Sequence, residues 1–313
     1  MTGVTVVIGN HQGASVLGDC LTSLHAQTHQ VKEIVVVDGA STDESRRVAE
    51  ELGARFVADE NRGLGALYNR GAADTASPYL LFLNNDVALA PTCVELLARE
   101  LANDDRRFAA DPTQLDWVGE NVIHARTIMS RGRLLREYLP GYHLDDRVPA
   151  ATVTPTVAAH GAAMLVRRSM FEQLGGFDET FFMEWEDLDL CWRAWLRGWS
   201  SVYVPDARLR HRVGAVTTTT VAPRRAASSH HNMVRFALKC LPARAAGRLI
   251  LGQMLRLPKH PRAIATGGLR VARELPEILR LRQDQRRIAP LLAYVGEPTY
   301  ERKRLRPRGR VAR

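Results

Sequence analysis

Apolar positions in the first ninety residues fall into short runs, which are separated by stretches with helical periodicity. Leu17, Leu21 and Leu24 recur at the spacing that places them on one face of a helix. The runs are rich in β-branched residues, which predicts buried strands over residues 4–8, 33–38, 54–58 and 78–83. Strands that alternate with helices are typical of βαβ units. The sequence therefore predicts an α/β protein with a mostly parallel central sheet flanked by helices.

Cap and turn residues predict where further elements begin and end. Ser41 and Glu44 have the spacing of a capping box, and Gly53 is expected to end the helix that they open. Pro91 suits the first turn of the helix after the fourth strand. Residues 103–158 have no clear period and contain several turn residues, so we expect an irregular insert that shapes a substrate site.

Regular patterns return after this insert and change again near residue 240. Residues 162–168 and 201–205 are predicted strands, with an acidic helix between them. We divide the chain into a domain of residues 1–240 and a basic helical tail of residues 241–313.

Proline residues are expected to break the tail into separate helices. Basic helical patterns cover residues 243–257 and 269–287, and the prolines are Pro258, Pro276 and Pro290. The last dozen residues are expected to be unfolded.

The positive charge of the chain is concentrated in this tail. Residues 244–313 hold 18 Lys and Arg against 5 Asp and Glu, a net charge of +13, so the remainder carries −4 of the total of +9. Basic helices with interleaved leucines suit the anionic surface of a membrane. Nucleic-acid binding uses the same charge, but the tail has no recognisable binding module. A solvated basic surface without a partner is the third interpretation.

Composition excludes several classes of protein. With 45% hydrophobic and 25% charged residues, the chain is not disordered throughout. Its four cysteines are scattered and no secretory leader is visible, which favours the reducing cytoplasm, with the inner face of the cell membrane as an expected peripheral location. No apolar run approaches the roughly 20 residues that span a bilayer.

Polar residues stand at the ends of three predicted strands. Asn10 follows the first strand, Asp38 closes the second, and Asn84, Asn85 and Asp86 close the fourth. In a doubly wound sheet the carboxyl ends of the strands meet where ligands bind. The alternative is that these residues only make turns, as Asn and Asp often do.

A phosphate-binding glycine loop is absent from the sequence. Residues 63–71 fail the GxGxxG spacing because Tyr68 stands where the third glycine belongs. A bound diphosphate would then need a divalent cation, and an Asp at a strand end is a suitable ligand. Asp86 is therefore a candidate metal ligand.

The stretch FFMEWEDLDLCWRAWLRG, residues 181–198, places four acids among aromatic rings. A carboxylate in apolar surroundings is costly unless its charge is used. One interpretation is that Asp187, in the first turn of a helix, removes a proton from a hydroxyl group. The other is that the acids only decorate the helix. We prefer this second interpretation for Asp189, which is expected to pair with Arg193 one turn later.

Five stretches in this order resemble family 2 glycosyltransferases of the GT-A fold, and among them bacterial rhamnosyltransferase-like enzymes of cell-wall and polysaccharide assembly. They are residues 4–45, 60–73, 80–91, 161–199 and 211–216, and the resemblance covers roughly residues 4–240. The ordered combination is more specific than any of its motifs. One departure is that the family's first strand usually runs into a Pro-Thr-Tyr-Asn-like turn, whereas this chain has Gly-Asn-His-Gln-Gly.

The resemblance implies a donor site and a metal site. Asp38 would bind the pyrimidine ring of a nucleotide-diphosphate sugar, and Asp86 would be the metal-binding end of a degenerate DxD motif that begins with Asn84. His211 would complete the site for Mg²⁺ or Mn²⁺. The remaining donor-binding positions would be Asn10, Arg62 and Asn85.

The same resemblance implies a catalytic base in the acidic stretch, at Asp187 or Glu186. Positions that would contact the acceptor or the sugar are Gly161, Phe182 and Trp185. The expected reaction is transfer of a hexose with inversion, and rhamnose is the sugar that the resemblance favours. The acceptor would be a hydroxyl of a lipid-linked molecule or a polysaccharide. A plausible partner for such an enzyme is the anionic membrane surface, which the basic tail would bind.

Two alternatives have other chemistry. The weakened Asn-Asn-Asp motif is compatible with a catalytically inactive protein that binds nucleotide sugars. A nucleotidyltransferase would use a similar sheet and release pyrophosphate, but the basic nucleotide loop expected after its first strand is absent.

Overall fold

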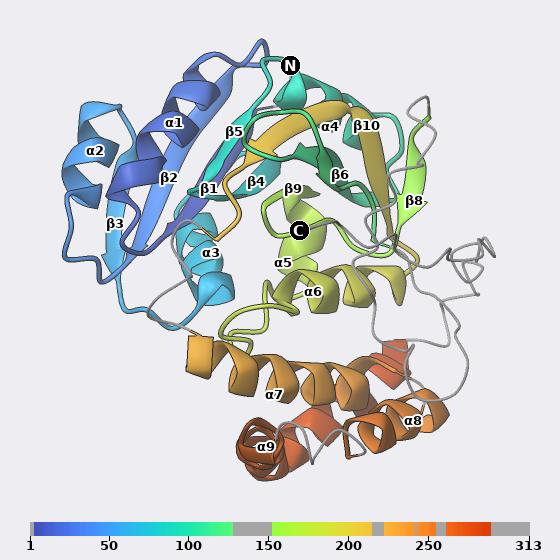
Figure 1. Cartoon of the computed structure of the whole chain (residues 1–313). Helices are drawn as coiled ribbons and strands as arrows, with labels where there is room; N and C mark the ends of the chain where they lie inside the picture. Colours follow the sequence, from blue (N-terminus) through green and yellow to red (C-terminus); the bar gives the residue numbers. More distant parts are fainter. Residues whose placement is uncertain (1–2, 128–151, 215–221, 242, 255–260, 289–313) are drawn as a thin grey trace, which may run out of the picture.

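The computed structural model describes residues 3–127, 152–214, 222–241, 243–254 and 261–288. They form a sheet of ten strands with helices on both faces (Figure 1). The strand order is β3-β2-β1-β4-β9-β6-β10-β5, with β7 beside β6 and β8 beside β10. Most of the paired residues belong to parallel pairs. The predicted α/β fold with a mostly parallel sheet is therefore confirmed.

The bounds of the elements follow the chain. The strands are β1 (Val4–Asn10), β2 (Val31–Gly39), β3 (Arg55–Asp59), β4 (Tyr79–Asn84), β5 (Val87–Leu89), β6 (Arg107–Leu115), β7 (Val122–His124), β8 (Thr154–Thr156), β9 (Ala163–Arg167) and β10 (Ser200–His211). The helices are α1 (Ala14–His25), α2 (Ser45–Glu51), α3 (Leu64–Ala73), α4 (Cys93–Ala102), α5 (Arg168–Gln173), α6 (Glu186–Trp195), α7 (Ala222–Cys240), α8 (Ala243–Met254) and α9 (Pro261–Ile288).

The parallel half of the sheet, β3-β2-β1-β4, arises from the first ninety residues. All of β1 is buried because helices cover both faces, which explains its continuous apolar run. Val4, Val6 and Ile8 belong to the core under α1, α2 and α4, whereas Val7 belongs to the core under α3, α5 and α6. In register, Asn10 of β1 stands beside Asp38 of β2. The carboxyl ends of these strands thus lie at one edge.

The insert expected to be irregular contains a central strand, so that prediction was wrong for part of residues 103–158. Strand β6 lies between β9 and β10, and its residues from Phe108 to Gln114 are buried. Its sequence, RFAADPTQL, has an Asp-Pro pair and no alternation of apolar and polar residues. These residues have low strand propensity, so tertiary pairing decides the conformation here. The rest of the insert includes residues 128–151, which lie outside the described ranges.

Two local predictions about helix boundaries are also corrected. Helix α2 begins at Ser45 without a side-chain cap, and the hydroxyl of Ser41 bonds Asp38 instead of opening the helix. Pro276 lies inside α9 and does not end it. Pro258, Pro290 and the last dozen residues lie outside the described residues.

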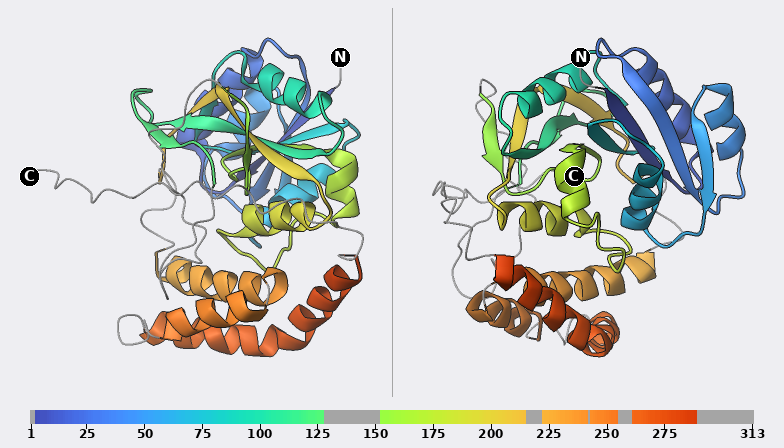
Figure 2. Two further views of the ribbon diagram at one scale, coloured as in Figure 1. Left: turned by 90° about the vertical axis from the view of Figure 1, so that its right-hand side faces the viewer. Right: turned by 180° about the vertical axis from the view of Figure 1, so that it is seen from behind.

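The C-terminal helices form a further layer next to α6. Helix α7 lies against α6, with α8 and α9 beyond it, at the bottom of Figure 1 and of both views in Figure 2. The division of the chain at residue 240 stays a prediction. No helix in the described part of the chain is long and apolar enough to cross a membrane.

Candidate active site

A buried hydrogen-bond network joins the ends of three neighbouring strands. The side-chain amide of Asn10 donates to Oδ2 of Asp38 at 2.6 Å, and the amide of Asn85 donates to Oδ1 of Asn10 at 2.6 Å. Ser41 adds two bonds of 2.7 Å to Asp38, from its backbone N–H and its hydroxyl. The strand ends that the sequence singled out therefore meet at one edge of the sheet.

Gly13 lies directly against this network. A Cβ at this position would come within 2.1 Å of both Oδ1 of Asn10 and Nδ2 of Asn85. No side chain fits there without displacing the pair. The glycine therefore lets the first turn after β1 pack closely on the two amides.

Asp86 faces His211 across the same edge. Oδ1 of Asp86 lies 3.2 Å from Nε2 of His211, yet it accepts no hydrogen bond from any residue in the described part of the chain. Nδ1 of His211 is 3.1 Å from Oε1 of Gln114, which can only accept. Nδ1 therefore carries the proton in the neutral ring, and Nε2 turns a lone pair toward Asp86. Two lone pairs at this distance repel each other unless a cation or a proton on Nε2 lies between them.

This pair fits a divalent cation. Ligands about 2.1 Å from an octahedral ion lie about 3 Å apart, which agrees with the separation of 3.2 Å. An imidazole whose other nitrogen is held by a side chain is the usual form of a metal-bound histidine. Two protein ligands leave positions for phosphate oxygens and water, as is common for Mg²⁺. Asp86 and His211 could therefore hold such an ion. The described residues contain no group of three or more His, Cys, Asp or Glu suited to a metal.

Tyr68 connects the strand ends to the acidic helix. Its hydroxyl lies 3.1 Å from Oδ1 of Asn84 and 3.2 Å from the carbonyl oxygen of Gly161. The backbone N–H of Gly161 in turn donates to Oδ2 of Asp187 at 2.8 Å. Asp187 is thus linked through Gly161 and Tyr68 to Asn84, two residues before Asp86 at the carboxyl edge of the sheet.

The adjacent acids of α6 differ in environment. Asp187 accepts backbone bonds at both oxygens, because Leu188 N donates to Oδ1 at 2.7 Å and Gly161 N to Oδ2. Burial, and then the charge of Asp187, raise the pKa of Glu186 from 4.5 to about 8. No hydrogen bond within the described residues reaches Oε2 of Glu186. Glu186 is therefore mainly protonated at neutral pH. Asp187 is fixed more firmly, because both of its oxygens accept backbone hydrogen bonds.

The loop before α6 packs against the segment that the resemblance assigned to the donor. Gly63 has φ of +110°, and a Cβ there would lie 2.4 Å from the carbonyl oxygen of Phe182. Arg62 is half exposed and pairs with Glu179 at 2.8 Å. Trp185 packs its ring on Phe236 of α7, with centroids 5.6 Å apart. The donor role of Arg62 and the sugar contacts of Phe182 and Trp185 stay predictions.

Three polar residues behind Asp187 were missed from the sequence. Asp111 in β6 accepts a 3.2 Å bond from the backbone of His160, and one of its oxygens lies 3.1 Å from Nε2 of His124. Burial raises the pKa of Asp111 and lowers that of His124 to about 4 and that of His160 to about 3. These groups hold the backbone around Gly161. The Asp-Pro pair inside a buried strand was the only sequence signal.

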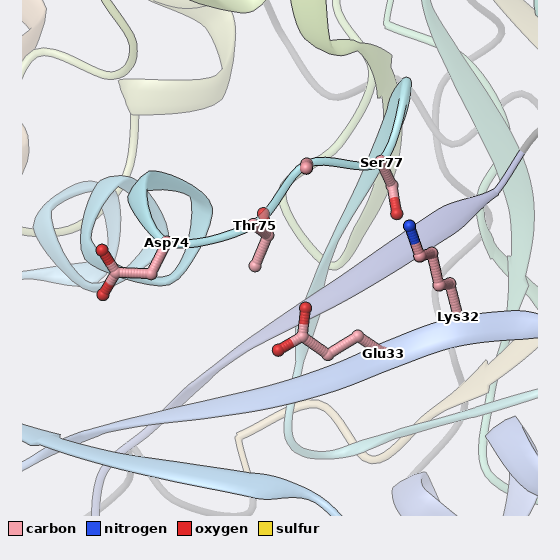
Figure 3. Close-up of a pocket in the computed structure, with 6 residues that line it drawn as sticks. Lys32, Glu33, Asp74, Thr75 and Ser77 are labelled. Carbon is pink, nitrogen blue, oxygen red and sulfur yellow. The ribbon is translucent and has the colours of Figure 1, made fainter.

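A pocket at the opposite edge of the sheet is unrelated to this network. It is lined by Lys32 and Glu33 at the start of β2 and by Asp74 to Ser77 before β4 (Figure 3). The carboxyl-end edge, and not this pocket, carries the polar residues described above.

Comparison with known proteins decides the family. The profile of glycosyl transferase family 2 matches residues 5–175, which is more than half of the chain. The chain belongs to this family. This glycosyltransferase is 31% identical over 236 residues to an N-acetylglucosaminyl-diphospho-decaprenol L-rhamnosyltransferase of Mycobacterium tuberculosis, covering 67% of this chain and 76% of that protein.

Two solved structures share the GT-A fold of this glycosyltransferase. A mannosyltransferase from Pyrobaculum calidifontis in complex with GDP-Man and Mn²⁺ superposes with a TM-score of 0.56 at 19% identity, covering 92% of this chain and 80% of that one. GalNAc-T7 with UDP, GalNAc and Mn²⁺ gives a TM-score of 0.55 at 16% identity, covering 82% and 54%. At these identities the likeness shows the fold alone.

Proposed function

We propose that this glycosyltransferase moves a hexose from a nucleotide-diphosphate sugar to a hydroxyl of a lipid-diphosphate-linked acceptor, with inversion at the anomeric carbon. The observation that carries the proposal is that hydrogen bonds link Asp38 to Asn85 and Asp187 to Asn84, the two residues that directly precede Asp86 at the carboxyl edge of the sheet. Rhamnose as the sugar, and a lipid-linked acceptor, are supported by the name of the relative at 31% identity.

In the proposed reaction, Asp187 is the general base. An acceptor oxygen attacks the anomeric carbon while its proton moves to a carboxylate oxygen of Asp187, and the bond from that carbon to the diphosphate breaks. The nucleoside diphosphate leaves with the electron pair, so no covalent enzyme intermediate forms. The two backbone bonds fix Asp187 in place and leave its other lone pairs available for the acceptor proton.

The donor half of the site would hold the nucleotide and the diphosphate. Asp38, oriented by Asn10 and Ser41, is placed to accept a bond from the base of the nucleotide. Asp86 and His211 would hold Mg²⁺ or Mn²⁺, and the bound cation would stabilise negative charge on the diphosphate. Asn84 and Asn85 complete this edge as hydrogen-bonding side chains.

The C-terminal helices would bind the anionic surface of the membrane that carries the acceptor. Their exposed large apolar residues are Leu251 and Met254 of α8 and Leu269, Leu275 and Leu279 of α9. Arg262, Arg270, Arg273 and Arg280 are exposed on α9. Each cationic side chain near such a surface adds about 1 kcal/mol. Replacing Arg273 and Arg280 by Glu should therefore abolish sedimentation with phosphatidylglycerol vesicles. Sedimentation of this double variant with the vesicles would contradict the proposed binding of the C-terminal helices to a membrane surface.

The enzymatic part is tested with a panel of nucleotide sugars. A selective donor should raise the melting temperature in the presence of Mn²⁺ and support transfer to a polyprenyl-diphosphate acceptor. Asp187→Asn should abolish transfer and keep the donor-induced thermal shift. Full transfer by this variant would remove Asp187 as the base. A thermal shift without transfer by the wild-type protein would support a binding protein instead.

A further inference from the structure

Helix α7 contacts the loop before α6 through one buried amide. Asn232 is fully buried, and its Nδ2 donates to the carbonyl oxygens of Met183 at 2.8 Å and Glu184 at 2.9 Å. Carbonyl oxygens only accept hydrogen bonds, so the NH₂ end of Asn232 must face the loop. Both donor hydrogens of this amide are therefore used to hold two consecutive backbone carbonyls.

The loop that Asn232 holds has an unusual backbone. Glu184 and Trp185 have φ of +66° and +79°, a region that residues other than glycine rarely occupy. Such a pair persists only when its surroundings fix it. Trp185 is also the N-cap of α6, without a side-chain cap bond, and Glu186 and Asp187 follow it directly. The conformation of this pair therefore determines where the first turn of α6 places Asp187.

The side-chain amide of Asn232 is linked to α9 through His231. Its Oδ1 is 2.8 Å from Nδ1 of His231, and Nε2 of His231 is 2.8 Å from Oε2 of Glu274. Both ring nitrogens thus face oxygens that accept hydrogen bonds. Burial opposes the ionisation of Glu274, but bonds from His231 and Arg270 outweigh it, and the pKa of Glu274 lies below its ordinary value. A chain of hydrogen bonds thus runs from α9 through α7 to the loop.

We propose that Asn232 is a positioning residue for glycosyl transfer: it holds the backbone of Met183 and Glu184 so that α6 presents Asp187 to the acceptor, and Glu274 holds Asn232 through His231. The proposal rests on the proposed role of Asp187. The arrangement of the helices agrees with it, because α7 lies between α6 and α9 in all three views (Figures 1 and 2). In this account the C-terminal helices are part of the catalytic apparatus although they carry no catalytic residue.

The sharpest test is Asn232→Asp, which keeps the shape of the side chain and replaces its NH₂ donors by an acceptor. A shift of about 1 Å in a catalytic group can cost roughly 100-fold in rate, so kcat should fall by up to about that factor. The KM for the donor should stay unchanged, because Asn10 and Asp38 are held by bonds within the sheet edge. Backbone amides of residues 183–190 should also exchange faster with deuterium. A merely structural role would lower the melting temperature without changing kcat per folded molecule.

Two matched variants on α9, at Glu274 and Glu277, provide a second test with its own control. This test can be carried out even if Asn232→Asp does not fold. Glu274 and Glu277 both pair with Arg235, at 3.1 and 3.2 Å, but only Glu274 bonds His231. Glu274→Ala should therefore lower kcat and speed exchange in the loop, whereas Glu277→Ala should do neither. Unchanged kcat and unchanged exchange in folded Asn232→Asp, or in Glu274→Ala if the former does not fold, would overturn the proposal.

The exchange measurement separates this proposal from the proposed function. If the wild-type protein transfers no sugar, the function fails while the exchange rates of the loop still decide whether Asn232 holds it. If the wild type transfers sugar and both variants match it in kcat and exchange, only the positioning role fails.

Discussion

Asp187 and Asp189 stand two residues apart on α6 and meet opposite surroundings. Asp189 is fully buried between cations, with Nε of Arg193 at 2.8 Å and Nζ of Lys239 at 2.8 Å. Burial opposes its ionisation, but Lys239 and Arg193 outweigh that cost and lower its pKa. Asp187 accepts backbone N–H bonds from Gly161 and Leu188, and no ion pair in the described part of the chain includes it. The predicted pairing of Asp189 with Arg193 is confirmed.

The difference separates acids that hold the fold from acids that can act on a ligand. Asp178, like Asp189, contacts two cations, Arg235 at 3.1 Å and Lys239 at 2.7 Å. Asp38, like Asp187, accepts bonds from neutral donors, the amide of Asn10 and Ser41. A carboxylate already neutralised by cations has little charge to offer a proton or a ligand, whereas neutral donors orient it and leave that charge available.

The largest expected effect is a loss of stability when Arg235, which pairs with the structural acid Asp178, is replaced. Arg235 has no exposed surface and contacts Asp178, Glu274 and Glu277. Arg235→Met would leave Asp178 with Lys239 alone, and breaking a buried pair in this way costs roughly 3–5 kcal/mol. Urea unfolding measures the loss. Arg273→Met, at an exposed position of α9, is the control and should change stability by about 0.5 kcal/mol or less. Equal stability of the two variants would contradict the claim that the cations around Asp178 hold the fold.

A smaller effect is expected where a neutral group orients a site residue. Gln114→Leu removes the acceptor that fixes the tautomer of His211, so Mn²⁺ affinity should fall about 10-fold to 100-fold. Calorimetric titration of Mn²⁺ in the presence of UDP or GDP measures it. Stability without metal should fall by about 1–3 kcal/mol, because Nδ1 of His211 loses its acceptor, whereas Nε2 of Gln114 has no partner among the described residues to lose. Unchanged Mn²⁺ affinity would remove Gln114 from the metal site.

Gly13→Ala tests the uncharged hydrogen-bond donors that orient Asp38, by measuring affinity for the nucleotide-sugar donor. The added Cβ would displace the amides of Asn10 and Asn85, so one or two hydrogen bonds of about 1 kcal/mol each are weakened and donor affinity falls several-fold. Gly18→Ala is a matched control in α1, where an added Cβ meets nothing within 4 Å. Since alanine favours a helix interior, the control should be stabilised by up to about 1 kcal/mol and keep its donor affinity. Equal donor affinity in both variants would contradict the account.

A further effect is a pH dependence of stability at Glu186. Its pKa rises from 4.5 to about 8 on folding, so between these values the folded state binds more protons than the unfolded state. Stability contributed by the protonated group is complete below about pH 4.5 and is lost as the pH rises to about 8. Glu186→Gln cannot ionise, so its melting temperature should exceed that of the wild type increasingly over this window. Parallel curves for the two proteins would show that Glu186 is not the buried protonated acid.

The sequence was sufficient for the parallel half of the fold, because its strands are buried on both faces. Continuous apolar runs such as residues 4–8 and 78–83 are typical of strands covered on both sides, and β1 and β4 occupy them. The same pattern placed Asn10, Asp38 and Asn84 at strand ends, where the register brings them together. Local pattern and tertiary structure agree here, so the edge that carries the candidate site was predictable.

The rest depends on contacts between distant residues that carry no local pattern. Strand β6 is held by its neighbours despite the Asp-Pro pair, so Asp111 and Gln114 were missed. Arg235 and Lys239 of α7 are buried against acids near α6, and no local pattern in the sequence indicates this. The sequence could not show which cations meet which acids, and so it could not reveal that Asn232 reaches the loop before α6.

The most direct test compares Asp187→Asn with Asp189→Asn, two isosteric changes on one helix, by measuring kcat and the free energy of unfolding for both. Asp187→Asn should lower kcat by roughly 100-fold to 10,000-fold. It should cost about 1–3 kcal/mol of stability, because the amide oxygen can accept only one of the two backbone bonds. Asp189→Asn should lose about 3–5 kcal/mol of stability, because Lys239 and Arg193 lose their shared carboxylate, while kcat per folded molecule stays within a few-fold. Loss of activity without loss of stability at Asp189, or full activity of Asp187→Asn, would contradict the division between structural and site acids.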